Sequence, residues 1–269
     1  MALVVFSDLD GTLLDHDTYS WQQAAPALEA LKSRRVPLIL CSSKTRAEML
    51  PLQEELGIHQ PLISENGGAV FAPEGHPLAG DDWQDTGDGW RMRPLGRPVA
   101  ELRRALAGFK QRFGAKGFGD MSDREVAWLT GLSLDKAALA RRREFSEPVW
   151  LPEPQAQGDE FMAAARAAGL EVTRGGRFFH LLGGGDKGKA VRLVLEIMRR
   201  QDPALVSLAL GDAENDLPML ETVDLPVLVA RPDGGHAELE LPGLVKTELP
   251  GPAGWNLAVL QTLARLEAS

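Results

Sequence analysis

Residues 3–12 read LVVFSDLDGT, an apolar run followed at once by two carboxylates. An uninterrupted run of this kind predicts a strand that is buried on both faces of a parallel sheet. Asp8 and Asp10 would then lie at the carboxyl end of that strand, where open α/β sheets bind ligands. The alternative is a plain turn that an aspartate caps with its side chain.

Strand and helix signals alternate at both ends of the chain. Strands are predicted at 3–7, 36–41, 61–64, 205–210 and 225–229, and helices around Ala24 to Leu31, at 46–56, at 187–200, from Asn215 and at 255–266. In between, the pattern changes register: helices are predicted at 99–113, 123–129, 135–143 and 159–168, and strands at 116–119, 148–151, 171–173 and 177–182. This order predicts an α/β fold, a doubly wound and mostly parallel Rossmann-like core with an inserted α+β domain.

We expect residues 1–82 and 184–269 to form the core domain and residues 83–183 to form the inserted domain. The Gly/Pro/Asp-rich stretch 72–89 lies at the first boundary, and its aspartates are spaced wrongly for a calcium-binding EF-hand loop. A solvated hinge is the favoured interpretation of the acidic segment that contains Asp81, Asp82, Asp85 and Asp88.

Composition excludes several classes of protein. The chain has 269 residues, 44% of them hydrophobic, and a net charge of −9, which indicates a globular protein and argues against broad nucleic-acid binding. The single cysteine, Cys41, has no intramolecular disulfide partner. Neither a secretory leader nor an apolar run long enough to cross a bilayer is evident. We therefore expect a cytoplasmic protein without a membrane partner; the oligomeric state is left open.

A second carboxylate cluster follows the predicted strand 205–210. Residues 211–216 read GDAEND, so Asp212 and Asp216 would lie at the same edge of the sheet as Asp8. Oxygen ligands at this edge favour a hard cation, and Mg²⁺ is the expected one. Zinc is disfavoured because no two histidines are spaced four residues apart. Asp212 could also serve as a helix N-cap.

Two further segments carry groups that suit a phosphoryl oxygen. Ser42, Ser43 and Lys44 follow the predicted strand 36–41, although either serine could simply cap the next helix. Lys187 opens a helix after residues 183–186, which read GGGD. Residues 183–190 nearly match a P-loop, but Ala190 stands where the magnesium-binding hydroxyl is required.

These motifs occur in the order found in haloacid dehalogenase-like phosphatases, and the chain resembles that superfamily. The insertion resembles the α+β cap domain of its sugar-phosphatase branch. Four blocks resemble the mannosyl-3-phosphoglycerate phosphatase family over essentially the whole chain: CSSKT at 41–45, ENGG at 65–68, GFGDMS at 117–122 and REFSEP at 143–148.

The resemblance implies a Mg²⁺-dependent phosphomonoester hydrolase that works through an aspartyl-phosphate intermediate. Asp8 would be the nucleophile and Asp10 the general acid and base. Asp8, the Asp10 carbonyl and Asp212 would bind the metal, with Asp216 and Asn215 completing or orienting that site. Ser42 and Lys187, assisted by Ser43, would hold the phosphoryl oxygens.

The resemblance also implies a substrate: mannosyl-3-phosphoglycerate would be converted to mannosylglycerate, a compatible solute, with glucosyl-3-phosphoglycerate as a second substrate. Lys44 and Arg143 are expected at the carboxylate of the substrate. The full set of expected substrate-binding residues is Lys44, Glu65, Asn66, Gly67, Arg143, Ser146, Arg177 and His180.

Three alternatives on the same fold stay open at this stage. They are a general sugar-phosphate phosphatase, a phosphotransferase of the phosphomannomutase kind, and a non-catalytic sugar-phosphate-binding regulator. Phosphate release, measured with and without a bisphosphorylated sugar activator, separates the first two.

Overall fold

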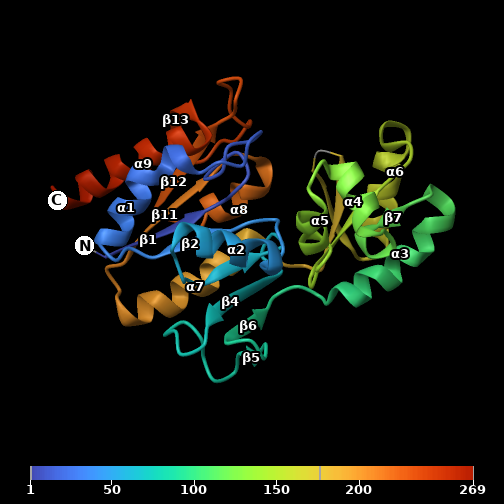
Figure 1. The fold of residues 1–269 in the computed structure, drawn as a ribbon, viewed down its shortest axis with the longest axis horizontal. Helices are drawn as coiled ribbons and strands as arrows, with labels where there is room; N and C mark the ends of the chain where they lie inside the picture. Colours follow the sequence, from blue (N-terminus) through green and yellow to red (C-terminus); the bar gives the residue numbers. More distant parts are fainter. Residues whose placement is uncertain (1, 176, 269) are drawn as a thin grey trace.

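The computed structural model describes residues 2–175 and 177–268, which form two bodies lying side by side (Figure 1). Within these residues the named strands form one nine-stranded and one four-stranded sheet. The order in the large sheet is β13-β12-β11-β1-β2-β3-β4-β6-β5, and in the small sheet β7-β8-β10-β9. This arrangement confirms the predicted α/β fold.

The centre of the large sheet is parallel. Strand β1 (Leu3–Ser7) pairs with β2 (Leu38–Cys41) on one side and β11 (Val206–Gly211) on the other. Strands β3 (Leu62–Ser64) and β12 (Leu225–Ala230) continue the parallel pairing outward. These five parallel strands, all predicted from the sequence, therefore have their carboxyl ends at one edge of the sheet.

Helices cover both faces of this sheet because successive side chains of β1 point in opposite directions. Leu3 and Val5 pack in one apolar core with helices α1 (Ala25–Ser33), α2 (Arg46–Leu56) and α9 (Gly251–Glu267). Val4 and Phe6 pack in a second core with α7 (Lys187–Gln201) and α8 (Leu217–Leu220). Each such buried side chain contributes about 1.5–3 kcal/mol to folding. Short 3₁₀ turns η1 (Gln22–Ala24) and η3 (Glu214–Asp216) complete this body.

The acidic segment that carries Asp81, Asp82, Asp85 and Asp88 is solvated, but the prediction that it is a hinge is wrong. Strands β4 (Ala69–Pro73), β5 (Gln84–Asp85) and β6 (Trp90–Pro94) extend the large sheet with antiparallel pairing. Strand β4 returns directly beside β3 because residues 65–67 all adopt positive φ, which makes a tight hairpin turn. A further edge strand, β13 (Val245–Pro250), was also not predicted; its exposed and charged residues conceal the strand pattern.

The small sheet contains β7 (Lys116–Gly117), β8 (Ser146–Trp150), β9 (Glu171–Gly175) and β10 (Phe178–Leu182). Helices α3 (Val99–Phe113) and α6 (Pro154–Ala167) share one apolar core with it. The turn η2 (Phe118–Asp120), α4 (Asp123–Thr130) and α5 (Leu134–Ala140) form a separate cluster that includes Trp150 and Phe178. Helix α5 ends at Ala140, whereas the sequence predicted an end at residue 143. Helix α6 begins at Pro154, whereas the sequence predicted a start at residue 159.

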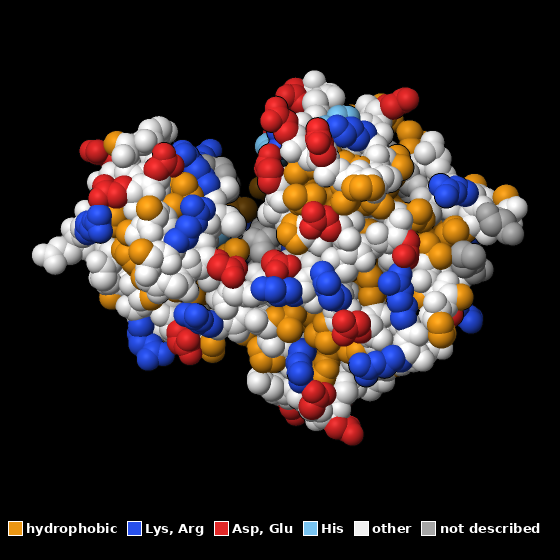
Figure 2. Space-filling model, turned by 180° about the vertical axis from the view of Figure 1, so that it is seen from behind, with side chains coloured by type: hydrophobic (Ala, Val, Ile, Leu, Met, Phe, Trp, Pro, Cys, Tyr) orange, Lys and Arg blue, Asp and Glu red, His pale blue; other side chains and the backbone are white. Residues whose placement is uncertain are grey.

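The division into domains stays our proposal, with one revision. Since residues 84–94 pair within the large sheet, we assign them to the core and place the start of the cap near α3. Of the proposed domain ranges, residues 1, 176 and 269 lie outside the described residues. Figure 2 shows the two bodies from behind as separate lobes with a notch between them. Across the part of the chain that the structure describes, we find no helix with the length and apolar character needed to cross a bilayer.

Candidate active site

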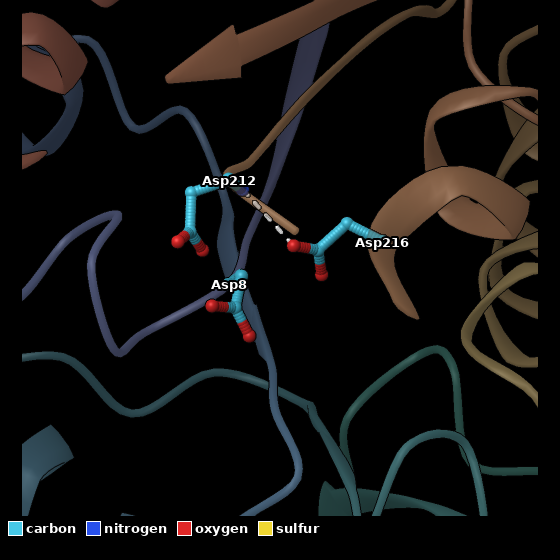
Figure 3. Close-up of side chains that lie close together, drawn as sticks. All are labelled: Asp8, Asp212 and Asp216. Atoms are coloured by element: carbon cyan, nitrogen blue, oxygen red, sulfur yellow. Dashed lines mark hydrogen bonds between the residues drawn. The ribbon is translucent and has the colours of Figure 1, made fainter. Parts of the chain in front are cut away.

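Three carboxylates converge at the carboxyl edge of the large sheet. Asp8 follows β1, Asp212 follows β11, and Asp216 closes the 3₁₀ turn η3 behind them. One carboxylate oxygen from each lies within 4.8 Å of the others, and Figure 3 shows the three side chains pointing toward one another. Two segments two hundred residues apart in the sequence are joined here because β1 and β11 are neighbours in the sheet.

The ammonium of Lys187 lies between two of these carboxylates. Its Nζ is 2.6 Å from Asp8 Oδ1 and 2.5 Å from Asp216 Oδ1, and the side chain is fully buried at the start of α7. Burial lowers the pKa of Lys187, but the charges of Asp216 and Asp8 outweigh it and raise the pKa above its usual value. Lys187 is therefore a permanent cation in this site.

Asp216 holds the loop that carries Asp212. Its Oδ2 accepts hydrogen bonds from the backbone N–H groups of Asp212 at 3.0 Å and Ala213 at 3.1 Å, the first drawn in Figure 3. Both Asp216 oxygens are thus occupied, by these amides and by Lys187. Asp216 therefore orients the cluster, which fits the orienting role predicted for it better than direct binding of a metal.

Asp8 and Asp212 offer the open oxygens. Among the described residues, neither Asp8 Oδ2 nor Asp212 Oδ2 has a hydrogen-bond partner, whereas Asp212 Oδ1 accepts the hydroxyl of Thr12 at 3.1 Å. The donor set is entirely oxygen, which fits a hard divalent cation. Gly11 leaves space for a cation beside Asp212, because a Cβ at this position would lie 2.7 Å from Asp212 Oδ2. Its φ of +78° also favours glycine.

Excess negative charge at this edge changes how two of the acids titrate. Burial raises the pKa of Asp212 to about 6, and the neighbouring Asp216 charge acts in the same direction. Burial also raises the pKa of Asp8, against the attraction of Lys187. A bound cation would relieve both effects, so the cluster favours a metal on electrostatic grounds.

Asp10 and Ser42 flank the cluster. Asp10 Oδ2 is 2.6 Å from the ammonium of Lys44, while its buried Oδ1 has no partner among the described residues. Ser42 is buried at the end of β2, and its Oγ accepts the backbone N–H of Lys44 at 3.3 Å. The structure therefore places at this edge of the sheet Asp8, Asp10, Ser42, Lys44, Lys187, Asp212, Asn215 and Asp216, and the catalytic and metal-binding roles of these residues stay predictions.

Glu65 and Ser146 contact each other at the junction of the two bodies. The carboxylate of Glu65 accepts the Ser146 hydroxyl at 2.6 Å and the backbone N–H groups of residues 144–146 at 2.7–3.1 Å. Every partner belongs to the segment entering β8, and Glu65 is 1% exposed. These bonds place the pair at the junction, and its contact with substrate stays a prediction.

Asn66 and Gly67 connect that junction to the site. Asn66 Oδ1 accepts the side-chain amide of Asn215 at 3.2 Å, beside the carboxylate cluster. A Cβ on Gly67 would lie 2.1 Å from the Asp186 carbonyl oxygen, so only glycine permits the turn to pack against the start of α7. The ENGG block thus links cap, Lys187 helix and acidic loop.

The remaining predicted substrate residues lie in the cap. Arg143 donates to the Ser43 carbonyl at 2.7 Å, which ties the end of α5 to the core. His180 lies on β10, where burial and the Arg143 charge lower its pKa to about 4. The structure does not bring Arg177 to the site, because it precedes β10 and the chain returns to the core at the other end of that strand.

Three residues near the site were not singled out from the sequence. Thr12 donates a hydrogen bond to Asp212. Its place in the DLDGT motif at residues 8–12 is the sequence feature that could have identified it. Tyr19 and Lys136 approach Lys44 from a loop and from α5, respectively. No motif marks these two residues, since only the docking of the cap brings them together.

The fold and this site define a class of protein. Residues 5–82 match the family described as haloacid dehalogenase-like hydrolase. A solved structure from Thermoplasma acidophilum superposes with a TM-score of 0.68 at 18% identity, covering 97% of this chain and 98% of that one. At that identity the likeness shows the shared fold.

Full-length relatives give the closer assignment. The chain is 42% identical to a glucosyl-3-phosphoglycerate/mannosyl-3-phosphoglycerate phosphatase of Methanococcoides burtonii, with 98% of each chain covered. It is 40% identical to a protein of the same name from Persephonella marina, again with 98% of each covered. The chain belongs to this family of phosphatases within the haloacid dehalogenase-like hydrolases, which confirms the resemblance predicted from its motifs.

Proposed function

We propose that this protein is a Mg²⁺-dependent phosphatase that hydrolyses mannosyl-3-phosphoglycerate and glucosyl-3-phosphoglycerate to the glycosylglycerates and phosphate. The observation that carries the proposal is the Asp8–Lys187–Asp216 arrangement beside the open oxygens of Asp8 and Asp212, in a chain similar over its full length to phosphatases of that name. A cytoplasmic location stays a prediction from the sequence.

Asp8 is the nucleophile in this proposal. Lys187 holds Asp8 Oδ1 at 2.6 Å, which leaves Oδ2 free to attack phosphorus. A bond from Asp8 Oδ2 to phosphorus forms as the bond from phosphorus to the ester oxygen breaks. A divalent cation would be held by Asp8, the Asp10 carbonyl and Asp212, and when bound it would neutralise part of the phosphoryl charge.

Asp10 moves the proton in both steps. It donates a proton to the departing ester oxygen, so that the glycosylglycerate leaves as a neutral alcohol at that position. It then removes a proton from water, whose oxygen attacks phosphorus and displaces the Asp8 carboxylate. Ser42 lies buried beside the site with its hydroxyl proton available to a phosphoryl oxygen.

A phosphate-release panel tests the proposal. Both glycosyl-phosphoglycerates are compared with 3-phosphoglycerate, mannose phosphates, sucrose phosphate and p-nitrophenyl phosphate, with Mg²⁺ and with EDTA. We expect the highest kcat/KM for the glycosyl-phosphoglycerates, and no turnover in EDTA. Faster hydrolysis of simple hexose phosphates would leave a general sugar phosphatase, and activity that requires a bisphosphorylated sugar would indicate a phosphotransferase.

A further inference from the structure

A small cavity lies on the seam between core and cap, and its lining includes Lys44, the partner of Asp10. It has a volume of about 180 Å³ and is lined from the core by Tyr19 and Lys44 and from the cap by Leu132, Lys136 and Leu139. Two contacts seat α5 beside α2 here: Thr45 Oγ1 donates to the Leu139 carbonyl at 3.1 Å, and Arg143 donates to the Ser43 carbonyl. The cavity therefore exists only when the cap is docked.

Two ammonium groups face one aromatic ring in this cavity. Lys44 Nζ lies 5.2 Å and Lys136 Nζ 5.6 Å from the centre of the Tyr19 ring, one cation from each body of the protein. Such contacts favour a cation, so the ring offsets part of the repulsion between the two lysines. One ammonium group from each body thus faces the same ring, in a cavity whose lining also includes Glu48 and Glu55.

Lys136 differs from the other cations around the site in having no carboxylate partner among the described residues. Lys187 is held by two aspartates, and Arg143 donates to two backbone carbonyls and lies 3.9 Å from Glu48. Lys44 bonds to Asp10 alone, which leaves two of its three N–H donors.

The acidic groups that line the cavity are already engaged. Glu48 accepts hydrogen bonds from the backbone and hydroxyl of Thr45, and Glu55 accepts the indole N–H of Trp21 at 2.7 Å. Neither carboxylate contacts Lys136 or Lys44. A bound anion would therefore meet two available ammonium groups in this cavity.

Tyr19 is held in place by its own loop. It adopts a φ of +57°, a strained conformation for a tyrosine, and 41% of it is exposed. Its N–H donates to the Asp15 carbonyl at 3.0 Å, while the Asp15 side chain accepts the N–H and the hydroxyl of Thr18. A strained and exposed ring persists only where the surrounding structure enforces it.

From this juxtaposition we propose that Tyr19, Lys44 and Lys136 form the subsite for the glycerate carboxylate of the substrate; the inference rests on the proposed function. The ester oxygen lies beside Asp10 during proton transfer, and Lys44 Nζ is 2.6 Å from Asp10 Oδ2. Two carbons separate that oxygen from the carboxylate carbon, a reach of about 4 Å. The carboxylate is therefore within reach of Lys44, and Lys136 lines the same cavity.

The subsite explains how the enzyme can select a carboxylated ester. A hexose phosphate carries no carboxylate to meet the two ammonium groups. It leaves Lys136 without an anionic partner among the described residues, and Lys44 with Asp10 alone. Because one cation comes from each body, a bound carboxylate also joins cap to core over the reacting phosphate.

The test compares two substrates in matched variants. One substrate is glucosyl-3-phosphoglycerate, and the other is its analogue with the carboxylate replaced by a hydroxymethyl group. For Lys136→Met we expect kcat/KM to fall about 10- to 100-fold with the carboxylate substrate and less than about 3-fold with the neutral analogue. Lys136→Arg should recover most of the loss. The control is Lys110→Met, a cap lysine on α3 paired with Asp120, which should behave as wild type.

The outcomes separate the two proposals. Equal losses with both substrates, or no loss with either, would overturn the carboxylate subsite while wild-type turnover of glucosyl-3-phosphoglycerate upholds the proposed function. Wild-type protein that hydrolyses neither substrate, yet hydrolyses p-nitrophenyl phosphate, would overturn both.

Discussion

Lys187 Nζ lies 2.6 Å from Asp8 Oδ1, and both residues are buried. The same ammonium contacts Asp216, so one buried cation balances two carboxylates that come from opposite ends of the chain. Removing one member of a buried ion pair leaves an uncompensated charge, which costs about 3–5 kcal/mol. The catalytic cluster is therefore also a structural element of the core.

Replacing Lys187 tests that double role. We expect Lys187→Met to lower the free energy of unfolding by about 3–5 kcal/mol and to abolish phosphate release, as measured by urea unfolding and a phosphate assay. Lys189→Met is the matched control, because Lys189 is exposed two residues away and should change stability by less than about 0.5 kcal/mol. A larger effect at Lys189 than at Lys187 would support the P-loop interpretation instead.

Substitutions of Asp8 and Asp10 should impair catalysis at different steps. Asp8→Asn should release no phosphate above background, because an amide is not a competent nucleophile. Asp10→Asn should lower kcat about 10²- to 10⁴-fold with little change in KM, since it removes proton transfer but no binding contact. Mass spectrometry of quenched Asp10→Asn should locate phosphate on Asp8. Phosphate on another residue would rule out the assignment.

Metal binding should depend on pH through Asp212, whose pKa is raised to about 6 by burial and by Asp216. A proton on Asp212 competes with the cation, so Mg²⁺ affinity should fall about tenfold for each pH unit below 6 and level off above it. Because the folded pKa exceeds the ordinary value of 3.8, the metal-free protein should lose stability as pH rises from about 4 to about 6.

Thermal unfolding at several pH values, with EDTA and with graded Mg²⁺, checks both parts of the metal prediction. Asp212→Asn should bind Mg²⁺ weakly and lose most of this pH dependence. A midpoint of Mg²⁺ binding that is unchanged between pH 5 and pH 7 in the wild type would contradict the electrostatic account of the cluster.

Glu65 should stabilise the junction between core and cap. Its carboxylate accepts three backbone N–H groups and the Ser146 hydroxyl, and each buried donor left without an acceptor costs about 1–3 kcal/mol. Glu65→Ala should therefore destabilise the protein more than Ser146→Ala, and should increase proteolysis near residue 144. If Glu65→Ala instead raises KM with unchanged unfolding, Glu65 contacts substrate and the junction assignment is wrong.

Much of the site was predictable because catalytic groups here follow apolar strands. The runs before Asp8, Ser42 and Asp212 indicate buried parallel strands, and parallel strands present their carboxyl ends at one edge. That geometry requires no knowledge of the packing of individual side chains. The hairpin at residues 65–68 was not predicted, although an Asn-Gly pair is typical of such a turn.

By itself, the sequence determined the α/β order of elements, the acidic cluster and the family, since these depend on local periodicity and on short contiguous motifs. Only the tertiary structure decided that Glu65 bonds to the cap entrance, that Arg177 lies away from the site, and that Lys136 and Lys44 approach the same Tyr19 ring. The physical reason is that these relationships arise where two separately folded bodies meet. Their pairing depends on how the cap docks, which no periodicity within either segment encodes.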